Sequence, residues 1–250
     1  MIINAGGPIP QLRKLWKNTF GDPDGYLDRF FDTAYSKDRC FCILDDQQVI
    51  TMLYWFDAQW DNKKIAYLFA AATDIDHRGQ GLCRKLMDHT HRFLQEQGYY
   101  GVVLSPAEPS LFHFYGKMGY KPFSPVDTFT CQAGATPAKL KRLTSAEYCL
   151  QRKSFLPKNS VLQEGLTLDF LSTYSEFWTG EDFLLCCAKE GNTLYVQELL
   201  GDPHSAAGIV TALNCAEGHF RTPGSQAPLA MYLPLREDDR IPAYFGLPLD

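Results

Sequence analysis

The sequence predicts an α/β fold, with α and β elements arranged on a mixed sheet. Residues 65–73 form a nearly unbroken apolar run, which is typical of a strand buried on both faces. A glycine-containing turn follows it, and an amphipathic helix then runs to Gly98 with apolar residues at three- and four-residue spacing. A second buried strand comes after this helix at residues 99–105. Strands and helices therefore alternate in this part of the chain, as they do in α/β proteins.

Composition sets broad limits on the kind of protein. The chain has 250 residues and a net charge of −5, which is enough for a large core in one or two domains. Basic residues are not clustered, so charge gives no indication of nucleic-acid binding. No apolar run reaches the roughly 18 residues of a membrane span. No basic and then hydrophobic segment opens the chain, so we expect a cytoplasmic protein without a membrane partner.

The cysteines are expected to be reduced core residues. They form no Cys-x-x-Cys pair, and several lie inside apolar runs. A zinc site would need ligands from scattered places, so no metal is predicted. The eight cysteines are Cys40, Cys42, Cys83, Cys131, Cys149, Cys186, Cys187 and Cys215.

Two helices and two strands are expected before the central apolar run. Residues 11–20 and 23–31 each carry an apolar face, and Asp22 between them can cap the second helix. Strands are expected at residues 40–44 and 49–56, joined by a polar turn. A second polar turn then leads into the central strand, so these strands form a meander.

The turn after the central strand is suited to binding an anion. A helix start leaves about four backbone N–H groups unpaired, and the helix dipole adds roughly half a positive charge. Gly79 and Gly81 remove side chains that would block this backbone, and Arg78 adds a cation. The sequence therefore predicts a phosphate or pyrophosphate site. A P-loop would need Lys after Gly81, and a dinucleotide fingerprint would need glycine where Arg84 stands.

Two motifs carry a resemblance to a known family. The run Arg78-Gly79-Gln80-Gly81-Leu82-Cys83 resembles the pyrophosphate loop of the GNAT superfamily of N-acyltransferases, which usually ends with Gly or Ala where this chain has Cys83. A strand, a proline break and a short helix follow, with Phe114-Tyr115 and then Gly119-Tyr120. GNAT proteins have this same succession, so residues 1–130 resemble a GNAT acetyltransferase domain.

The resemblance implies a GNAT acyl-CoA N-acyltransferase fold with acetyl-CoA, or another acyl-CoA, as co-substrate. It implies that backbone groups at residues 71–73 pair with the pantetheine arm and that the amides of residues 79–84 hold the pyrophosphate. It assigns to Tyr115 the protonation of the departing CoA thiolate, since a phenol with a pKa of about 10 is a fair acid for a thiolate. The implied coenzyme-binding residues are Ala71, Ala72, Thr73, Arg78, Gly79, Gln80, Gly81, Leu82, Cys83 and Arg84.

The general base is not assigned by the sequence. Many GNAT members use a Glu on an early strand, and the central strand here has no carboxylate. The C-terminal carboxylate of Asp250 is one candidate, because relatives of the enhanced-intracellular-survival type use their chain end in this way. The other open candidates are Asp57, Asp74, Glu108 and His113.

The resemblance implies an acetyl-CoA-dependent N-acetyltransferase. The amine of a small molecule or peptide would attack the thioester directly in a ternary complex. A non-catalytic acyl-CoA-binding regulatory or structural protein is the alternative, favoured by the missing obvious base. A Rossmann-type dehydrogenase is a third possibility and would require NAD. The sequence specifies neither the acceptor nor the oligomeric state.

The second half of the chain resembles a degenerate copy of the first. Helices are expected near residues 145–152 and 166–177, then a hairpin over 183–199, a helix to about Cys215, and strands near 219–221, 229–235 and 243–248. Its elbow has Asp202 and Pro203 in place of arginine and glycines, so it would repel pyrophosphate. Residues 131–250 are thus expected to be a GNAT-like module without its own CoA site. This order resembles the tandem arrangement of enhanced-intracellular-survival acetyltransferases, and the apolar tail is expected to be tied into the fold.

Overall fold

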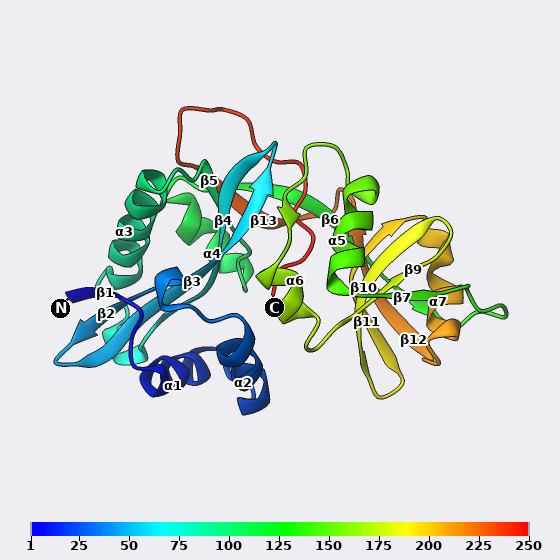
Figure 1. Cartoon of the computed structure of the whole chain (residues 1–250), viewed down its shortest axis with the longest axis horizontal. Coiled ribbons are helices and arrows are strands. Elements are labelled where there is room, and N and C mark those ends of the chain that lie inside the picture. The colour runs from blue at the N-terminus through cyan, green and yellow to red at the C-terminus, as the bar shows by residue number, and fades with distance from the viewer. Residues whose placement is uncertain (1, 250) are drawn as a thin grey trace.

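The computed structural model describes residues 2–249. In this range, 13 strands form one mixed sheet in the order β1-β2-β3-β4-β5-β13-β6-β12-β11-β10-β9-β7, with β8 paired to β3 (Figure 1). The strands are β1 (Ile2–Ala5), β2 (Cys40–Asp45), β3 (Gln48–Trp60), β4 (Lys63–Thr73), β5 (Gly101–Leu104), β6 (Lys121–Gln132), β7 (Lys141–Leu143), β8 (Leu162–Gln163), β9 (Glu176–Thr179), β10 (Phe183–Glu190), β11 (Thr193–Gly201), β12 (Glu217–Pro223) and β13 (Ala227–Pro234). The α-helices are α1 (Ile9–Phe20), α2 (Asp24–Thr33), α3 (Leu82–Glu96), α4 (Pro109–Gly116), α5 (Ser145–Phe155), α6 (Leu166–Leu171) and α7 (Ala206–Ala212). The 3₁₀ turns are η1 (Lys37–Arg39), η2 (Ile75–His77) and η3 (Pro203–Ser205).

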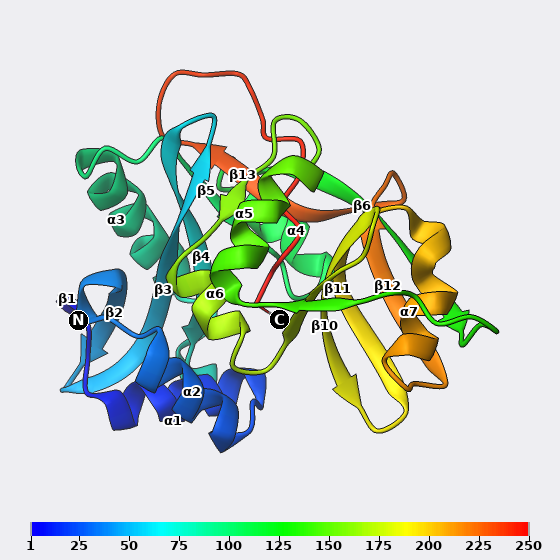
Figure 2. The same ribbon diagram turned by 45° about the vertical axis from the view of Figure 1, so that its right-hand side comes forward.

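The first half of the sheet is covered on both faces. Side chains alternate along β4, so Tyr67 packs in the cluster that holds Trp16 of α1 and Phe30 of α2. Its neighbour Leu68 points the other way, into the cluster that holds Leu86 of α3. Figures 1 and 2 show α1 and α2 on one side of these strands and α3 on the other. Burial on both faces explains why the central run reads as continuously apolar.

The second half repeats the element order of the first. Two helices, two antiparallel strands, a third strand, a 3₁₀ turn, a helix and a parallel strand occur in each half. The parallel pairs are β4 with β5 and β11 with β12. The corresponding 3₁₀ turns, η2 and η3, each begin at an aspartate. Its side chain accepts the backbone N–H of the residue two positions later, at 3.1 Å for Asp74 and 2.9 Å for Asp202. The predicted mixed sheet with a second, partial module is thus confirmed.

The two halves share the strands at the centre of the sheet. β13 comes from the end of the chain, yet it lies between β5 and β6 and pairs antiparallel with both. β6 in turn pairs with β12 of the second half. The division into residues 1–130 and 131–250 stays a prediction, and it falls close to the end of this shared β6.

Three local predictions were wrong. Residues 243–248 form no ladder: the isolated bridge there joins Ser160 to Tyr244. The helix expected to reach residue 177 ends as α6 at Leu171, since Ser172 and Thr173 turn their hydroxyls back onto carbonyl oxygens three residues earlier, at 2.6 and 2.7 Å. Asp22 does not cap α2, because its carboxylate instead accepts the indole N–H of Trp16 at 2.7 Å.

The tail is buried, as expected. Phe245 and Leu247 are 0% exposed and Leu249 is 2% exposed. The hydroxyl of Ser124 on β6 donates to the carbonyl oxygen of Phe245 and accepts its N–H, both at 2.9 Å. The last described residues therefore run between the two halves in both views (Figures 1 and 2). All eight cysteines are free thiols, and no helix between residues 2 and 249 is long and apolar enough to cross a membrane.

Candidate active site

A cavity opens where β4 and β5 separate. The two strands pair in parallel only from Ile65 to Tyr67 of β4, whereas β4 continues to Thr73. The space between them holds a cavity of about 440 Å³. Side chains from both faces of the sheet line it, among them Phe69 from the α1 and α2 side and Met87 from the α3 side. The cavity therefore connects one face of the sheet to the other through the gap.

The hydrogen-bond pattern of β4 gives the residues whose backbone faces this gap. Tyr100 N–H donates to Lys64 O at 2.7 Å, so even-numbered residues face β5 at this end of β4. Two residues, Ala70 and Ala71, then oppose one residue of β3, and Ala70 adopts a φ of 49°. This bulge reverses the alternation. Asp74 N–H consequently donates to Ile50 O of β3 at 2.8 Å.

The reversal separates the three residues expected to hold a pantetheine arm. Ala71 and Thr73 direct their N–H and C=O groups toward the open edge, as the alternation from Asp74 requires. Ala72 pairs with Met52 of β3 instead, so its backbone is used inside the sheet. The carbonyl oxygen of Thr73 accepts the Nε–H of Arg78 at 3.2 Å. The N–H and C=O groups of Ala71 are therefore free at this edge of hydrogen bonds from the described side chains.

The turn before α3 exposes its backbone. Gly79 and Gly81 have φ values of 77° and 73°, in the left-handed region that favours glycine. A Cβ built at either position meets no atom within 4 Å, so the space beside the turn is open. None of the hydrogen bonds among residues 2–249 uses the N–H groups from Gly79 to Cys83. Unpaired amides at the start of the 15-residue helix α3 are suited to binding an anion.

The side chains around this turn have distinct roles. Arg84 is exposed and its guanidinium donates to Lys117 O at 3.3 Å. Gln80 is exposed as well, and Leu82 is buried under α3. Cys83 packs against the α3 cluster, and burial raises the pKa of its thiol to about 11. At neutral pH, Cys83 is therefore a small apolar group, which fits the position where the family has Gly or Ala.

Tyr115 lies on α4 and lines the cavity. Its side chain is 9% exposed, and Leu111 and Phe112 of the same helix line the cavity beside it. Burial raises the pKa of Tyr115, and the nearby Cys83 adds to the shift. The phenol therefore stays protonated at neutral pH.

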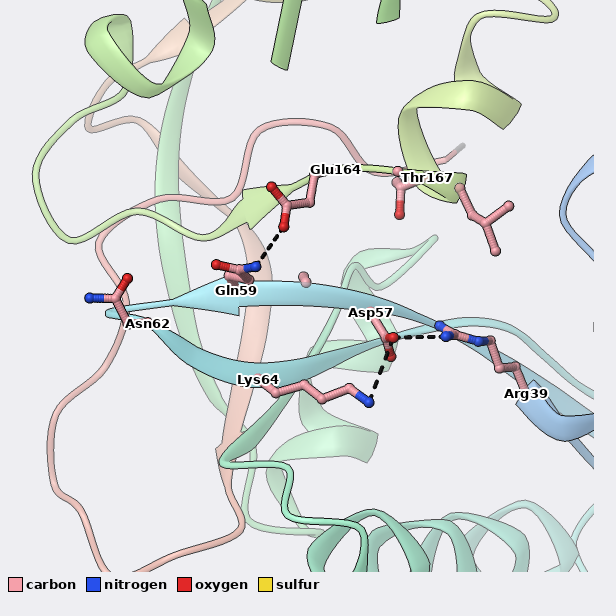
Figure 3. A pocket seen from close by; sticks show the side chains of 10 residues that line it. Arg39, Asp57, Gln59, Asn62, Lys64, Glu164 and Thr167 are labelled. Atoms are coloured by element: carbon pink, nitrogen blue, oxygen red, sulfur yellow. Dashed lines mark hydrogen bonds and ion pairs between the residues drawn. The ribbon is translucent and has the colours of Figure 1, made fainter. Parts of the chain in front are cut away.

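Most candidate bases lie away from the cavity. Asp57 lies in a separate pocket of about 500 Å³. There it pairs with Arg39 at 2.8 Å and Lys64 at 3.6 Å (Figure 3). Asp74 accepts from the His77 ring at 3.0 Å, which lowers the pKa of this carboxyl.

The remaining candidates divide into one that lines the cavity, one that does not, and one that lies outside the described residues. Glu108 lines the cavity at the start of α4. His113 is exposed on the same helix and is not among the lining residues. Asp250 lies outside the described residues. Asp22, which was not among the candidate bases, also lines the cavity. The sequence singled out Asp22 only as a possible helix cap, and its carboxylate between two helices was the available signal.

The end of the cavity on the α1 and α2 side of the sheet, away from Tyr115, is aromatic and is lined in part by the tail. Leu249 N–H donates to the Tyr67 hydroxyl at 2.9 Å, and the Tyr26 hydroxyl donates to Leu249 O at 3.2 Å. Both early helices, α1 and α2, contribute side chains to this end. The lining residues here are Trp16, Phe20, Asp22, Tyr26, Tyr67, Phe69, Pro228, Leu229, Pro248 and Leu249.

A family model matches the part of the chain that carries this cavity. Residues 7–123 match the model described as an acetyltransferase (GNAT) domain. This range includes the turn before α3 and the helix with Tyr115. The chain has no match among curated proteins.

Solved structures share the architecture of the whole chain. A GCN5-related N-acetyltransferase from Anabaena variabilis ATCC 29413 has a TM-score of 0.69 at 15% identity, covering 94% of this chain and 73% of that one. Eis1 from Mycobacterium abscessus has a TM-score of 0.60 at 12% identity, covering 91% and 66%. A tandem GNAT protein from the clavulanic acid biosynthesis pathway has a TM-score of 0.59 at 9% identity, covering 95% and 99%. At these identities the similarity shows a common fold that extends over both halves.

Proposed function

We propose that the chain is an acyl-CoA-dependent N-acyltransferase, because residues 7–123 match the GNAT acetyltransferase model and a tandem GNAT protein shares the fold of both halves. Its acceptor would be a primary amine. One observation carries the proposal: the open edge of β4 at Ala71 ends beside the unpaired amides that follow Gly79. A coenzyme that carries both amide groups and a diphosphate needs an open strand edge and unpaired amides side by side.

The residues at the gap fit acetyl-CoA. Ala71 would pair with the amides of the pantetheine arm as an added strand does. The N–H groups from Gly79 to Arg84 would hold the pyrophosphate, with Arg78 as a nearby cation. The open space at both glycines is a requirement for this fit, since a side chain there would enter the phosphate site. Acetyl-CoA would supply the thioester whose carbonyl carbon the amine attacks.

Proton transfers are the chemistry left to the protein. An amine bound as a cation must lose a proton before its nitrogen can form the new C–N bond, and the sulfur must gain one as the C–S bond breaks. Tyr115 would donate the second proton, since burial keeps its phenol protonated at neutral pH. Glu108 and Asp22 are the carboxylates that line the described cavity and would accept the first. Holding both reactants in one cavity supplies the rest of the acceleration.

Substitution of Gly81 by Glu tests the coenzyme site. A carboxylate would enter the anion site, and we expect acetyl-CoA binding to be lost by calorimetry. Gly98→Glu is the matched control, because Gly98 has a φ of 81°, open space around its Cβ and a place at the opposite end of α3. Both variants carry the same backbone strain, so only a loss confined to Gly81→Glu supports the site.

A thiol-release assay with acetyl-CoA and a panel of amines tests the reaction. We expect CoA release that depends on an amine. Retained binding by Gly81→Glu would refute the coenzyme site. Tight binding by the wild type with no release on any amine would instead favour a non-catalytic acyl-CoA-binding protein.

A further inference from the structure

We infer that the acceptor is a primary amine carried on an aromatic or similarly apolar body. The inference rests on the proposed function and concerns the end of the cavity that lies beyond the reacting groups. Three features of this end support it: its side chains are aromatic, its tyrosine hydroxyls are hydrogen-bonded to the tail, and the charged residues that line the cavity are acidic.

Aromatic rings form the wall of this end of the cavity. Phe69 and Tyr26 meet Trp16 at centroid distances of 5.3 and 6.3 Å in edge-on geometry. Phe20 is 41% exposed and meets Trp16 at 6.1 Å, so it stands at the mouth. Such rings are preorganised to pack against another ring or an alkyl chain in offset or edge-on contact.

The tail makes this wall less polar. The hydroxyls of Tyr26 and Tyr67 both bond to the backbone of Leu249, as given above. The side chains of Pro248 and Leu249 also line the cavity. The Trp16 N–H is likewise directed to Asp22 at 2.7 Å. A polyhydroxylated acceptor would thus bury hydroxyls with few partners, which is unfavourable because each buried hydroxyl loses its hydrogen bonds to water.

The charges in the cavity favour a cation. Asp22 and Glu108 line it, and no Lys, Arg or His occurs among its described lining residues. Asp22 is half-buried next to Trp16, so an ammonium group at that carboxylate would also lie near aromatic rings. An acceptor with its own carboxylate or sulfonate would meet only like charges. The cavity therefore selects for an amine with an apolar remainder.

The test compares acceptors at saturating acetyl-CoA, by thiol release and by mass of the product. The probes are 2-phenylethylamine, butylamine, glucosamine and taurine. We expect kcat/KM for 2-phenylethylamine to exceed that for glucosamine at least tenfold, and no acylation of taurine. Equal or better use of glucosamine or taurine would overturn the inference and leave the proposed function standing. No acylation of any amine would overturn both.

Two variants test whether this part of the cavity determines the preference for an aromatic amine. Phe20→Ala should reduce kcat/KM for 2-phenylethylamine about tenfold and leave that for butylamine within twofold. Asp22→Asn should raise the KM for both amines. Tyr195→Ala is the matched control, since this ring on β11 is 43% exposed and lies outside the cavity. An equal loss in Phe20→Ala and Tyr195→Ala would also overturn the inference.

Discussion

The buried ion pair between Arg152 and Glu198 should hold the tail that closes the acceptor end of the cavity. Arg152 of α5 donates to Glu198 of β11 through Nε at 2.7 Å and Nη2 at 2.8 Å. Both side chains are 0% exposed. The Tyr148 hydroxyl donates to the same carboxylate at 2.7 Å. The side chains of Arg152, Glu198 and Tyr148 thus meet inside the second half of the molecule.

This pair is in direct contact with the tail. Arg152 Nη2 also donates to the side-chain oxygen of Gln163 at 3.4 Å, and the amide group of Gln163 donates to Leu247 O. A Cβ built on Gly246 would lie 1.9 Å from Glu198 Oε1, so the tail backbone passes directly over the carboxylate. Three residues after Gly246, the Leu249 N–H donates to the Tyr67 hydroxyl in the cavity wall.

Glu198→Gln keeps the shape of the side chain and removes its charge. Arg152 would then be a buried cation without a counter-charge, and breaking a buried pair in this way costs about 3–5 kcal/mol. That is a large share of the roughly 5–15 kcal/mol that stabilises a typical protein. Replacing both residues, as Arg152→Met with Glu198→Leu, should cost less, because no uncompensated charge remains.

Urea unfolding and steady-state kinetics together test this reasoning. We expect Glu198→Gln to lower the free energy of unfolding by about 3 kcal/mol and to raise the acceptor KM. Acetyl-CoA affinity should be unchanged, because the hydrogen bonds of Arg152 and Glu198 go to Tyr148, Gln163 and each other and not to β4 or α3. Glu176→Gln is the matched control: Glu176 pairs with Arg142 at 2.8 Å, but these side chains are 43% and 64% exposed, so about 0–1 kcal/mol is expected. A Glu198→Gln protein as stable as the control would refute the energetic argument. An acceptor KM unchanged in a destabilised protein would refute the link to the tail.

Three further predictions concern Tyr115, strand β13 and His91. Tyr115→Phe should lower kcat by about 10²–10⁴ with little change in the acetyl-CoA Kd, and an unchanged kcat would remove Tyr115 from the reaction. Residues 1–130 alone lack β13 and should not give the cooperative unfolding transition of the whole chain, measured by circular dichroism. His91 bonds to the Tyr120 hydroxyl at 2.7 Å, and burial lowers its pKa from 6.5 to about 4. The neutral ring is favoured in the fold, so its contribution is complete above pH 6.5 and falls by about 3 kcal/mol as the pH drops to 4; His91→Gln should flatten that dependence in urea unfolding.

The parts of the fold that sequence reasoning predicted are those whose residues are neighbours along the chain. β4, the turn at Gly79 and Gly81, α3 and β5 follow one another, and each is specified by a local pattern of apolar residues and glycines. The same holds for α4 with Tyr115. Periodicity and turn chemistry describe such segments because their geometry depends on residues a few positions apart.

The missed features depend on contacts between distant residues. The residues of β13 predict a strand, but nothing in them specifies that it pairs with β5. That partner lies more than 100 positions earlier in the chain, a separation of about the length of a domain. The bulge at Ala70 contains no glycine, so the reversal that sends Ala72 toward β3 has no sequence signal. In the sequence, Asp57 fits the alternating pattern of a strand. Only the folded chain shows that Arg39 and Lys64 pair with its carboxylate and neutralise its charge. Patterns give the elements, whereas the cavity depends on which elements become neighbours.

The second half is part of the site even though its own elbow is unsuited to a diphosphate. It supplies β13, whose Leu229 carbonyl accepts the Ser105 hydroxyl at 2.8 Å beside the end of β5. It also supplies Pro228 and the tail residues Pro248 and Leu249 as walls of the cavity. A first half on its own would leave the β5 edge unpaired and the acceptor end open. The second half therefore completes the sheet and the cavity that Tyr115 lines.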